Sequence, residues 1–203
     1  MMKLFYSPTS PYVRKVLAIA YETGQVDRIE MLDCAAHPIT RDQSIVAVNP
    51  TGKVPALVLD DGTALYDSRV ICQYLDGQNS TAEMYPSEGP ARWDTLKRES
   101  LADGLLDAAI LARYEAVARP GEKLWQDWLD GQMEKIGSSI DQMALEVTGK
   151  DGIDAGDIAC ACALGYMDFR FSDHEWRSIY PALADWFAVI SERPSMKETL
   201  LKG

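Results

Sequence analysis

The stretch Tyr6-Ser7-Pro8-Thr9-Ser10-Pro11-Tyr12-Val13-Arg14 joins a short apolar segment to an amphipathic one. From Val13 to Ala20 the apolar residues recur at the spacing of one helix face. Ser10 stands where a helix N-cap belongs, and Pro11 takes the first helical position, where its missing N–H costs nothing. A helix N-terminus carries free N–H groups and a partial positive charge. The stretch therefore predicts a strand, a hydroxyl and a helix start in succession, an arrangement that can hold an anion.

Residues 1–76 predict a small sheet covered by helices. Strands over 4–6 and 28–32 flank the first helix as a βαβ unit, and a loop with a short helix follows over 34–48. A hairpin over 56–66 and one more helix complete the order. This is the layout of an α/β, thioredoxin-like domain that lacks a Cys-x-x-Cys pair.

The pattern changes after residue 76. Residues 77–90 are rich in turn formers and predict a linker. Beyond them the strand signal disappears, and residues 91–203 predict an all-α domain. Its expected helices cover 91–118, 122–147, 154–171 and 181–191, with a short helix closing the chain.

Two carboxylates near the start of the 154–171 helix could suggest catalysis. Asp154 stands at the N-cap position, and Asp157 lies three residues further on, where its side chain can reach back to the cap. That spacing is a variant of the capping box. We therefore expect both residues to be structural.

Composition and charge limit the class of protein. Of 203 residues 47% are hydrophobic, which predicts a globular chain. No apolar run reaches the roughly 18–20 residues of a membrane span, and the N-terminus lacks the layout of a signal peptide, so we expect a cytoplasmic protein. The net charge of −11 argues against a nucleic-acid partner. Residues 1–80 hold 7 basic and 9 acidic residues, and residues 81–203 hold 13 and 22, so the first part is the less repulsive host for an anionic ligand.

The chain has four cysteines and two histidines, which leaves few ligands for a metal, and we expect none. Cys72, Cys160 and Cys162 lie in apolar helical patterns, where buried packing is the expected role. Cys34 falls in a predicted loop, where it is either a packing residue or a reactive thiol.

Three motifs would converge at the strand ends and helix starts of such a domain. Ser10 opens the first helix, Lys53-Val54-Pro55 precedes a strand, and Asp67-Ser68 opens another helix. Each has an ordinary explanation on its own, as a cap, a turn or a surface lysine. If the Val54–Pro55 bond is cis, however, Val54 can turn its N–H and C=O outward to pair with an extended peptide.

Taken together, the motifs resemble those of the cytosolic glutathione transferases. TSPYVRKV at 9–16, NPTGKVPAL at 49–57 and Asp67-Ser68 match the three N-terminal motifs of that family in order and spacing. The resemblance covers essentially the whole chain and is closest to bacterial members of the theta-, omega- and tau-like side. Matches to the C-terminal half lie at 154–158, at 180–183 and 193–195, and at ADGLLDA over 102–108, which resembles the YibF-like branch.

This resemblance implies a glutathione transferase fold, with glutathione as co-substrate bound by the thioredoxin-like domain. Ser10 would face the glutathione sulfur, with Thr9 as the alternative contact. The backbone of Val54, presented by a cis Pro55, would pair with the cysteinyl residue, and Lys53 matches a basic position near the tripeptide. The resemblance also implies a homodimer that acts in detoxification, without metal, nucleic acid or membrane.

The remaining parts of glutathione would meet other residues. Asp67 and Ser68 match the pair that holds the γ-glutamyl amine and carboxylate. His37 and Arg41 are both candidates for the glycine carboxylate, and Asp103 is a weaker candidate for reaching the γ-glutamyl group across a dimer interface.

The absence of a cysteine at position 10 narrows the implied chemistry. Omega-type thiol–disulfide exchange lacks its nucleophile, and no tyrosine stands at the alpha-, mu- or pi-type catalytic place, since Tyr6 ends the first strand. Ser10 would act as a hydrogen-bond donor that stabilises the glutathione thiolate. Lowering a thiol pKa from about 8.5 by about two units requires roughly 2.7 kcal/mol. One hydrogen bond to a charge supplies about 1.5–3 kcal/mol and a helix end about 0.3–1 kcal/mol.

The resemblance places the electrophile between the two domains, against the helix at 101–115 and the C-terminal tail. Ile110, Arg113, Tyr114 and Tyr166 are candidate wall residues, and ordinary helix packing explains them equally well. A transferase acting on a small electrophile is the first hypothesis. The alternatives are a binding or regulatory protein on the same fold and a glutathione-dependent peroxidase or reductase.

Overall fold

The computed structural model describes residues 1–79, 82–149 and 152–203. Their contacts divide the chain into two compact units, one formed by Met1–Ser87 with Arg193–Gly203 and the other by Glu88–Glu192. The last segment therefore packs with the first unit, whereas the sequence placed it in the helical part. The predicted linker at 77–90 includes residues 80 and 81, which lie outside the described residues.

The first unit is built on a mixed sheet. Its strands are β1 (Met2–Tyr6), β2 (Ile29–Asp33), β3 (Ala56–Val58) and β4 (Ala64–Leu65). They lie in the order β2-β1-β3-β4, with β1 parallel to β2 and antiparallel to β3, and β3 antiparallel to β4. A parallel βαβ unit extended by a hairpin confirms the predicted thioredoxin-like layout.

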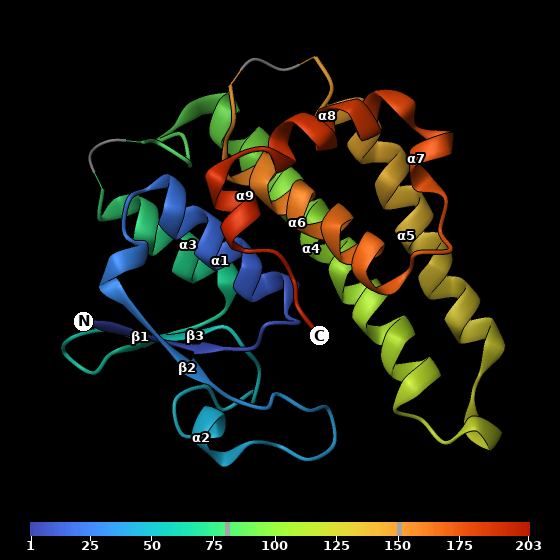
Figure 1. The fold of residues 1–203 in the computed structure, drawn as a ribbon, viewed down its shortest axis with the longest axis horizontal. Coiled ribbons are helices and arrows are strands. Elements are labelled where there is room, and N and C mark those ends of the chain that lie inside the picture. The colour runs from blue at the N-terminus through green and yellow to red at the C-terminus, as the bar shows by residue number, and fades with distance from the viewer. Residues whose placement is uncertain (80–81, 150–151) are drawn as a thin grey trace. The chain divides into compact units, whose positions relative to one another are not determined.

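Helices cover this sheet. They are α1 (Pro11–Glu22), α2 (Gln43–Val46), α3 (Ser68–Gly77) and α9 (Pro194–Glu198), with a short 3-10 turn η1 at Val26–Arg28. In Figure 1, α1 and α3 lie side by side against the strands and α2 lies on the other side. The α1 face predicted from the spacing of Val13 to Ala20 is buried as expected. Burial of that face holds the start of α1 at the end of β1.

Two residues of the predicted linker, Met84 and Tyr85, are bonded to the end of α3. The Asp76 carboxylate accepts hydrogen bonds from the backbone N–H groups of Met84 (2.7 Å) and Tyr85 (3.2 Å). Both of these side chains are buried. These contacts explain why the first unit extends to Ser87.

The C-terminal segment is held to α1 by charged groups. The Arg193 guanidinium donates two hydrogen bonds to the Glu22 carboxylate, at 2.7 and 2.6 Å, and the Ser195 hydroxyl donates a third. Arg14 donates to the Met196 carbonyl at 3.2 Å. Arg14 is therefore a buried structural residue.

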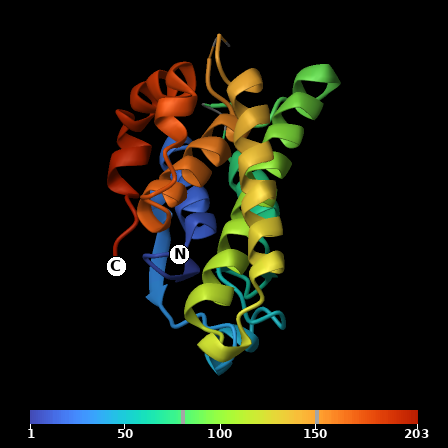
Figure 2. The same cartoon turned by 90° about the vertical axis from the view of Figure 1, so that its right-hand side faces the viewer.

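The second unit is helical, as predicted. It contains α4 (Gly89–Val117), α5 (Gln126–Glu146), α6 (Ala155–Arg170), α7 (Trp176–Ile179) and α8 (Pro181–Ser191), with a 3-10 turn η2 at Gly121–Lys123. Helix α6 is its core, buried without interruption over its first ten residues. Helix α4 packs against both α5 and α6, and the long α4 and α5 are seen alongside each other in Figure 2.

Two details differ from the helices expected in this part. The helix predicted over 122–147 begins at Gln126, because the backbone after Pro120 first forms the η2 turn. Helix α7 was not predicted, since one turn carries too short a periodic signal. It is held by Trp176, whose side chain is 1% exposed. The Trp176 Nε1–H donates a hydrogen bond to Asp168 at 3.0 Å, and its ring meets that of Phe187 edge-on, with 5.6 Å between the ring centres.

Asp154 and Asp157 form the predicted capping box at the start of α6. Asp154 accepts from the Gly156 and Asp157 N–H groups, and Asp157 accepts from the Asp154 N–H at 2.9 Å. Thr95 and Arg98 of α4 also bind the Asp154 carboxylate. The expectation that both carboxylates are structural is confirmed.

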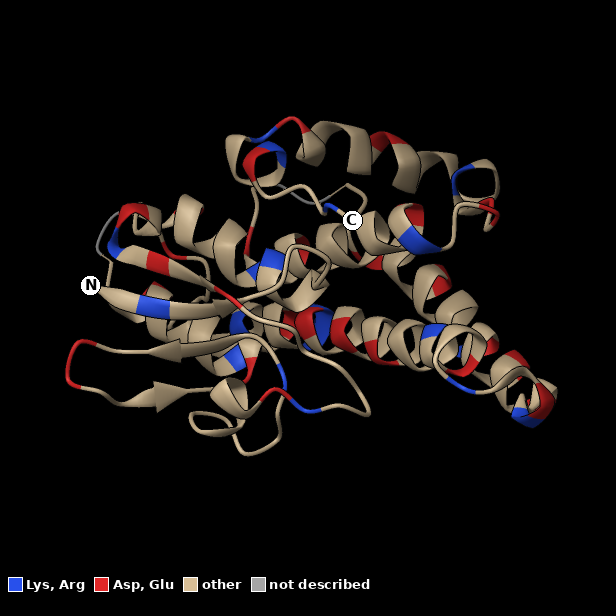
Figure 3. Ribbon diagram, turned by 60° about the horizontal axis from the view of Figure 1, so that its bottom comes forward, with Lys and Arg blue, Asp and Glu red and all other residues tan. Residues whose placement is uncertain are grey.

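Figure 3 shows Asp and Glu repeatedly along the helices of the second unit. Among the described residues, no helix is both long enough and apolar enough to cross a bilayer. Cys72, Cys160 and Cys162 have no exposed surface, which confirms that they pack in the interior.

Candidate functional site

Ser10 caps α1 and keeps a free donor. Its Oγ accepts a hydrogen bond from the Val13 N–H at 3.3 Å, and its carbonyl accepts one from the Arg14 N–H at 3.0 Å. Within the described part of the chain, the proton of the Ser10 hydroxyl has no acceptor. The side chain is only half-buried. It can therefore donate to a ligand that approaches the helix start.

Thr9 differs from Ser10 in its surroundings. Its Oγ1 lies 3.3 Å from Ser7 Oγ, so the two hydroxyls share a hydrogen bond. The backbone N–H of Ser10 closes the same loop by donating to the Ser7 carbonyl at 3.1 Å. Of the two adjacent hydroxyls, Ser10 is the one at the helix N-terminus and without an acceptor.

The loop before β3 is shaped by a buried asparagine. Asn49 donates from Nδ2 to the Lys53 carbonyl at 2.8 Å and accepts from the N–H and hydroxyl of Thr51 at 3.1 and 2.8 Å. Gly52 has a φ of 69°, which favours glycine, and an added Cβ there would lie 2.9 Å from Arg41 Nε. The Asn-Pro-Thr-Gly-Lys run thus sets the path of the chain into Val54.

Val54 presents open backbone groups. The Val54–Pro55 bond is cis, the isomer that the sequence could not show. No residue that the structure describes bonds to the N–H or C=O of Val54, and β3 begins only at Ala56. An extended peptide can pair with these two groups.

The start of α3 carries the third motif. Asp67 Oδ1 accepts from the Arg69 N–H at 3.0 Å, and the Asp67 carbonyl accepts from the Ile71 N–H at 3.1 Å. The Asp67 side chain is exposed, whereas Ser68 is 2% exposed. Sequence reasoning missed that the Tyr66–Asp67 bond is also cis, because no proline marks it.

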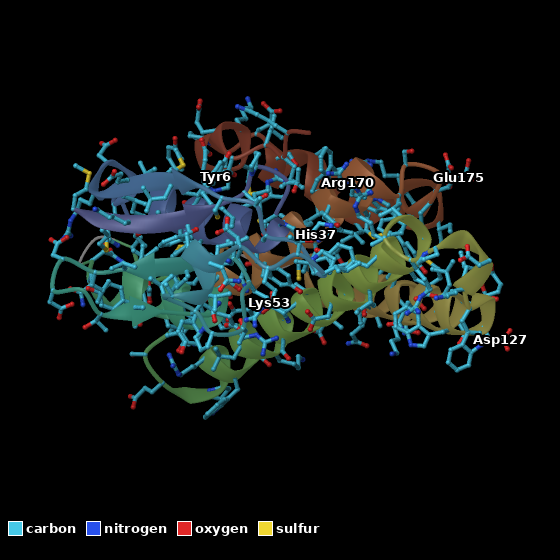
Figure 4. The ribbon with its side chains drawn as sticks, turned by 90° about the horizontal axis from the view of Figure 1, so that it is seen from below. Tyr6, His37, Lys53, Asp127, Arg170 and Glu175 are labelled. Atoms are coloured by element: carbon cyan, nitrogen blue, oxygen red, sulfur yellow. The ribbon has the colours of Figure 1, made fainter. Side chains whose placement is uncertain are left out.

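His37, Arg41 and Lys53 are exposed cations or potential cations of the first unit. His37 Nδ1 accepts from the N–H groups of Ile39 (3.2 Å) and Thr40 (3.0 Å), which leaves its Nε2 for a ligand. The Arg41 guanidinium donates to the Pro50 carbonyl. Figure 4 labels His37 and Lys53 among the side chains of this unit. Both His37 and Arg41 stay candidates for holding a carboxylate.

Tyr6 and Cys34 are less suited to chemistry. Cys34 donates from its backbone N–H and from its thiol to the Tyr6 carbonyl, both at 3.2 Å. Burial raises the pKa of the Cys34 thiol, and burial together with the Asp33 carboxylate raises the pKa of Tyr6. A raised thiol pKa disfavours the reactive alternative for Cys34.

One cavity of about 140 Å³ lies in the first unit beside Ser10. It is bounded by Tyr6, Ser10 and Arg14 on one side and by residues 198–202 of the C-terminal tail on the other. Neither Val54 nor Ser68 lines it. The cavity therefore meets the three motifs only at Ser10.

The candidate wall residues of the second unit lie on α4 and α6. Ile110, Arg113 and Tyr114 are half-buried, and Tyr166 is 3% exposed. Asp103 is 2% exposed within the single chain, which disfavours its reaching another subunit. Among the described residues, no group of three or more His, Cys, Asp or Glu side chains could hold a metal ion.

Comparison with known proteins places the chain in a family. Residues 9–78 match the model of the glutathione S-transferase N-terminal domain, and residues 126–188 match that of the C-terminal domain. The chain is 34% identical over 203 residues to the uncharacterized GST-like protein YibF of Escherichia coli K12, with 98% of each chain covered.

Solved structures agree with this match. A glutathione transferase family member from Pseudomonas fluorescens Pf-5 with bound glutathione superposes with a TM-score of 0.98 at 45% identity, covering 100% of both chains. The same kind of protein from that organism with bound S-(propanoic acid)-glutathione gives 0.93 at 44% identity, again over 100% of both chains. A glutathione S-transferase from Methylobacillus flagellatus KT with glutathione bound gives 0.89 at 34% identity and the same coverage. The chain belongs to the glutathione S-transferase family.

Proposed function

We propose that this protein is a glutathione transferase of the serine type, which stabilises the glutathione thiolate for attack on a small electrophile. The observation that carries the proposal is the Ser10 hydroxyl at the N-terminus of α1, whose hydrogen has no acceptor among the described residues. In related proteins at 45% and 34% identity, glutathione is the bound molecule. A hydroxyl donor at a helix start suits an anionic sulfur.

The rest of the tripeptide has matching groups in the first unit. The open N–H and C=O of Val54 pair with the backbone of the cysteinyl residue, and Lys53 adds positive charge. The exposed Asp67 carboxylate binds the γ-glutamyl ammonium, while Ser68 and the free N–H groups of α3 receive the γ-glutamyl carboxylate. His37 or Arg41 meets the glycine carboxylate. Thr9 supports the loop through Ser7 and is the second choice for the sulfur contact.

The reaction is a displacement or addition at carbon. The thiol proton leaves to solvent, the sulfur electron pair forms the C–S bond, and the electrophile loses a leaving group or takes up a proton. Ser10 stabilises the thiolate by about 1.5–3 kcal/mol and the end of α1 by about 0.3–1 kcal/mol, which together match the roughly 2.7 kcal/mol of a two-unit fall in pKa. The relative from Pseudomonas fluorescens Pf-5 that holds S-(propanoic acid)-glutathione supports a conjugate as the product.

Each part of the chain has a role in the proposed reaction. We place glutathione binding in residues 1–76 and the electrophile contacts in residues 91–203, with 77–90 as the connection. A cytoplasmic homodimer active in detoxification fits the family, and neither nucleic acid nor membrane is needed as a partner.

The test is a measurement of the bound thiol. Glutathione binding is followed by calorimetry, and the ultraviolet absorbance of the thiolate is titrated against pH with and without protein. We expect binding together with a bound-thiol pKa about two units below the free value of about 8.5. Binding without a lowered pKa would favour the alternative of a binding or regulatory protein. No binding at millimolar glutathione would exclude the transferase and would favour a regulatory protein on the same fold. Reduction of a hydroperoxide without conjugation would favour the peroxidase alternative.

A further inference from the structure

The cavity of about 140 Å³ lies between α1 and the C-terminal tail, and every residue that lines it belongs to the first unit. Helix α1 and its cap contribute Ser10, Arg14, Leu17 and Tyr21. Since each of these follows the one before by three or four residues, they lie on one face of the helix. The cavity is therefore a feature of the first unit alone.

The tail that covers the cavity is held at both of its ends. Arg193 donates two hydrogen bonds to Glu22, the last residue of α1, at 2.7 and 2.6 Å. The Lys202 N–H donates to the carbonyl of Pro8, which precedes α1, at 3.1 Å. The tail therefore runs antiparallel to α1, and in Figure 1 it leads from α9 to the end marked C. Because both ends are bonded, the tail forms a fixed wall of the cavity.

Arg14 lines this cavity as a buried charge without an acidic partner. Its side chain is 4% exposed, and a guanidinium carries N–H donors on each of its nitrogens. Within the described part of the chain it makes a single hydrogen bond, from Nη2 to the Met196 carbonyl at 3.2 Å, while Nε has no partner. No ion pair to Arg14 is formed by any residue that the structure describes. Most of its donor capacity is thus unused.

Arg98 of the second unit shows what a buried arginine usually has. It is 5% exposed, forms an ion pair with Asp154 and lies 3.5 Å from Asp157. A buried charge is costly unless such partners compensate it. Arg14 lacks them, so a carboxylate that enters the cavity would supply the missing partner.

The surrounding charges permit an anion in the cavity. The first turn of α1 holds no acidic residue, and the partial positive charge of that helix end favours an anion. Glu198 and Lys202 also line the cavity, but both are exposed and their charges are opposite in sign. Solvent screens exposed charges more than buried ones. The charge that decides the preference of the cavity is therefore that of Arg14.

We propose that this cavity binds a small carboxylic acid with an apolar, ring-sized body, whose carboxylate pairs with Arg14. The planar guanidinium presents parallel N–H donors that match a carboxylate. The body would contact the apolar and aromatic lining residues, namely Tyr6, Val13, Leu17, Tyr21, Val26, Met31 and Leu201. An apolar cavity of about 150 Å³ holds benzene, so an aromatic monocarboxylate such as benzoate is of suitable size.

This inference goes beyond the proposed function and does not depend on it. Ser10 also lines the cavity, but the proposed function gives its hydroxyl to the glutathione sulfur. Arg14 has no part in that function. We therefore assign the carboxylate to Arg14 and measure its binding in the absence of glutathione.

A matched set of ligands tests the charge and the ring separately. Calorimetry compares benzoate with benzamide, which has the same ring without the charge, and with acetate, which has the charge without the ring. We expect benzoate to bind at least about tenfold more tightly than either. Equal affinities for benzoate and benzamide, or no binding of benzoate at millimolar concentration, would overturn the site.

Substitution of Arg14 tests the charged partner. Arg14→Gln should weaken benzoate binding about tenfold and change benzamide binding less than about twofold. Arg28→Gln is the matched control, because Arg28 is an exposed arginine of the same unit that does not line the cavity, and it should change neither affinity. Wild-type affinity for benzoate in a folded Arg14→Gln variant, checked by circular dichroism, would overturn the role of Arg14.

A second variant places the ligand in the cavity even if Arg14→Gln does not fold. Leu201→Trp fills the cavity from the tail and leaves Arg14 in place, so it should abolish benzoate binding. Leu145→Trp adds the same side chain at a residue of α5 that is 76% exposed, and it should have no effect. Unchanged benzoate binding in Leu201→Trp would overturn the site. Absence of glutathione conjugation with these binding differences intact would overturn only the transferase assignment.

Discussion

The starts of α1 and α6 are both capped, yet they differ in what remains for a ligand. At α6, the Asp154 carboxylate binds Thr95 at 2.9 Å, the Gly156 N–H at 2.9 Å, the Asp157 N–H at 3.2 Å and the Arg98 guanidinium. At α1, the Ser10 hydroxyl accepts one backbone hydrogen bond and gives none within the described part of the chain.

The difference shows how a structural cap can be told from a functional one. Both sites have a capping side chain and a helix dipole, so neither feature distinguishes them. At Asp154 the protein itself supplies the partners, and the group is 9% exposed. At Ser10 the hydroxyl proton has no acceptor among the described residues, and the side chain is half-buried. Unused hydrogen-bonding capacity, and not the cap, marks the candidate site.

The largest expected effect is on stability at Asp154. Asp154→Ala leaves the buried Arg98 without its closest partner, so the free energy of unfolding should fall by about 3–5 kcal/mol, measured by urea denaturation. Asp154→Asn, which keeps the cap but removes the charge, should lose less. If Asp154→Ala retains wild-type stability but loses activity, the comparison between the two helix starts fails.

The next effect is on catalysis at Ser10. Ser10→Ala should lower the conjugation rate constant by about ten- to a thousandfold, because one preorganised donor to the sulfur is lost. Its free energy of unfolding should fall by only about 1 kcal/mol, the value of one cap. Thr9→Ala is the matched control and should keep most of the rate. The opposite ranking of the two variants would move the sulfur contact to Thr9.

A smaller effect is expected for glutathione affinity at Asp67. Asp67→Asn keeps an oxygen to cap α3 but removes the charge that would bind the γ-glutamyl ammonium. Calorimetry should show glutathione binding weakened by about tenfold, with little change in the turnover number at saturation. A fall in turnover at unchanged affinity would contradict the role of Asp67 in binding.

The smallest effect concerns the contact between α1 and the C-terminal segment. Burial raises the pKa of Glu22, but hydrogen bonds from Arg193 and Ser195 outweigh it, and the net pKa is lowered. A lowered folded-state pKa gives stability that is fully present above the unfolded value of about 4.3 and is lost as pH falls through the folded value. Since Arg193 is 37% exposed, solvent screening limits the gain.

Glu22→Gln should therefore lower the free energy of unfolding by about 1 kcal/mol at neutral pH. The difference from wild type should disappear in acid. Urea denaturation at a series of pH values measures it, and a difference that grows on acidification would contradict the assigned ion pair.

Much of the fold and of the candidate site could be predicted from local patterns. The apolar spacing from Val13 to Ala20 predicted the buried face of α1, and the Asp154–Asp157 spacing predicted the capping box. Helix α7 and the η2 turn were missed, because a single turn is decided by contacts such as that of Trp176 with Asp168. The order and spacing of the motifs at Ser10, Val54 and Asp67 resemble the family to which the chain belongs.

The sequence by itself determined where helices start, which faces are apolar and which side chains are chemically suited to an anion. These properties depend on residues within a turn or two of one another. Only the tertiary structure decided that Arg193–Gly203 packs on the first unit and that the Ser10 hydroxyl proton has no acceptor among the described residues. The physical reason is that the satisfaction of a polar group depends on neighbours distant in the chain, which folding alone brings within hydrogen-bonding reach.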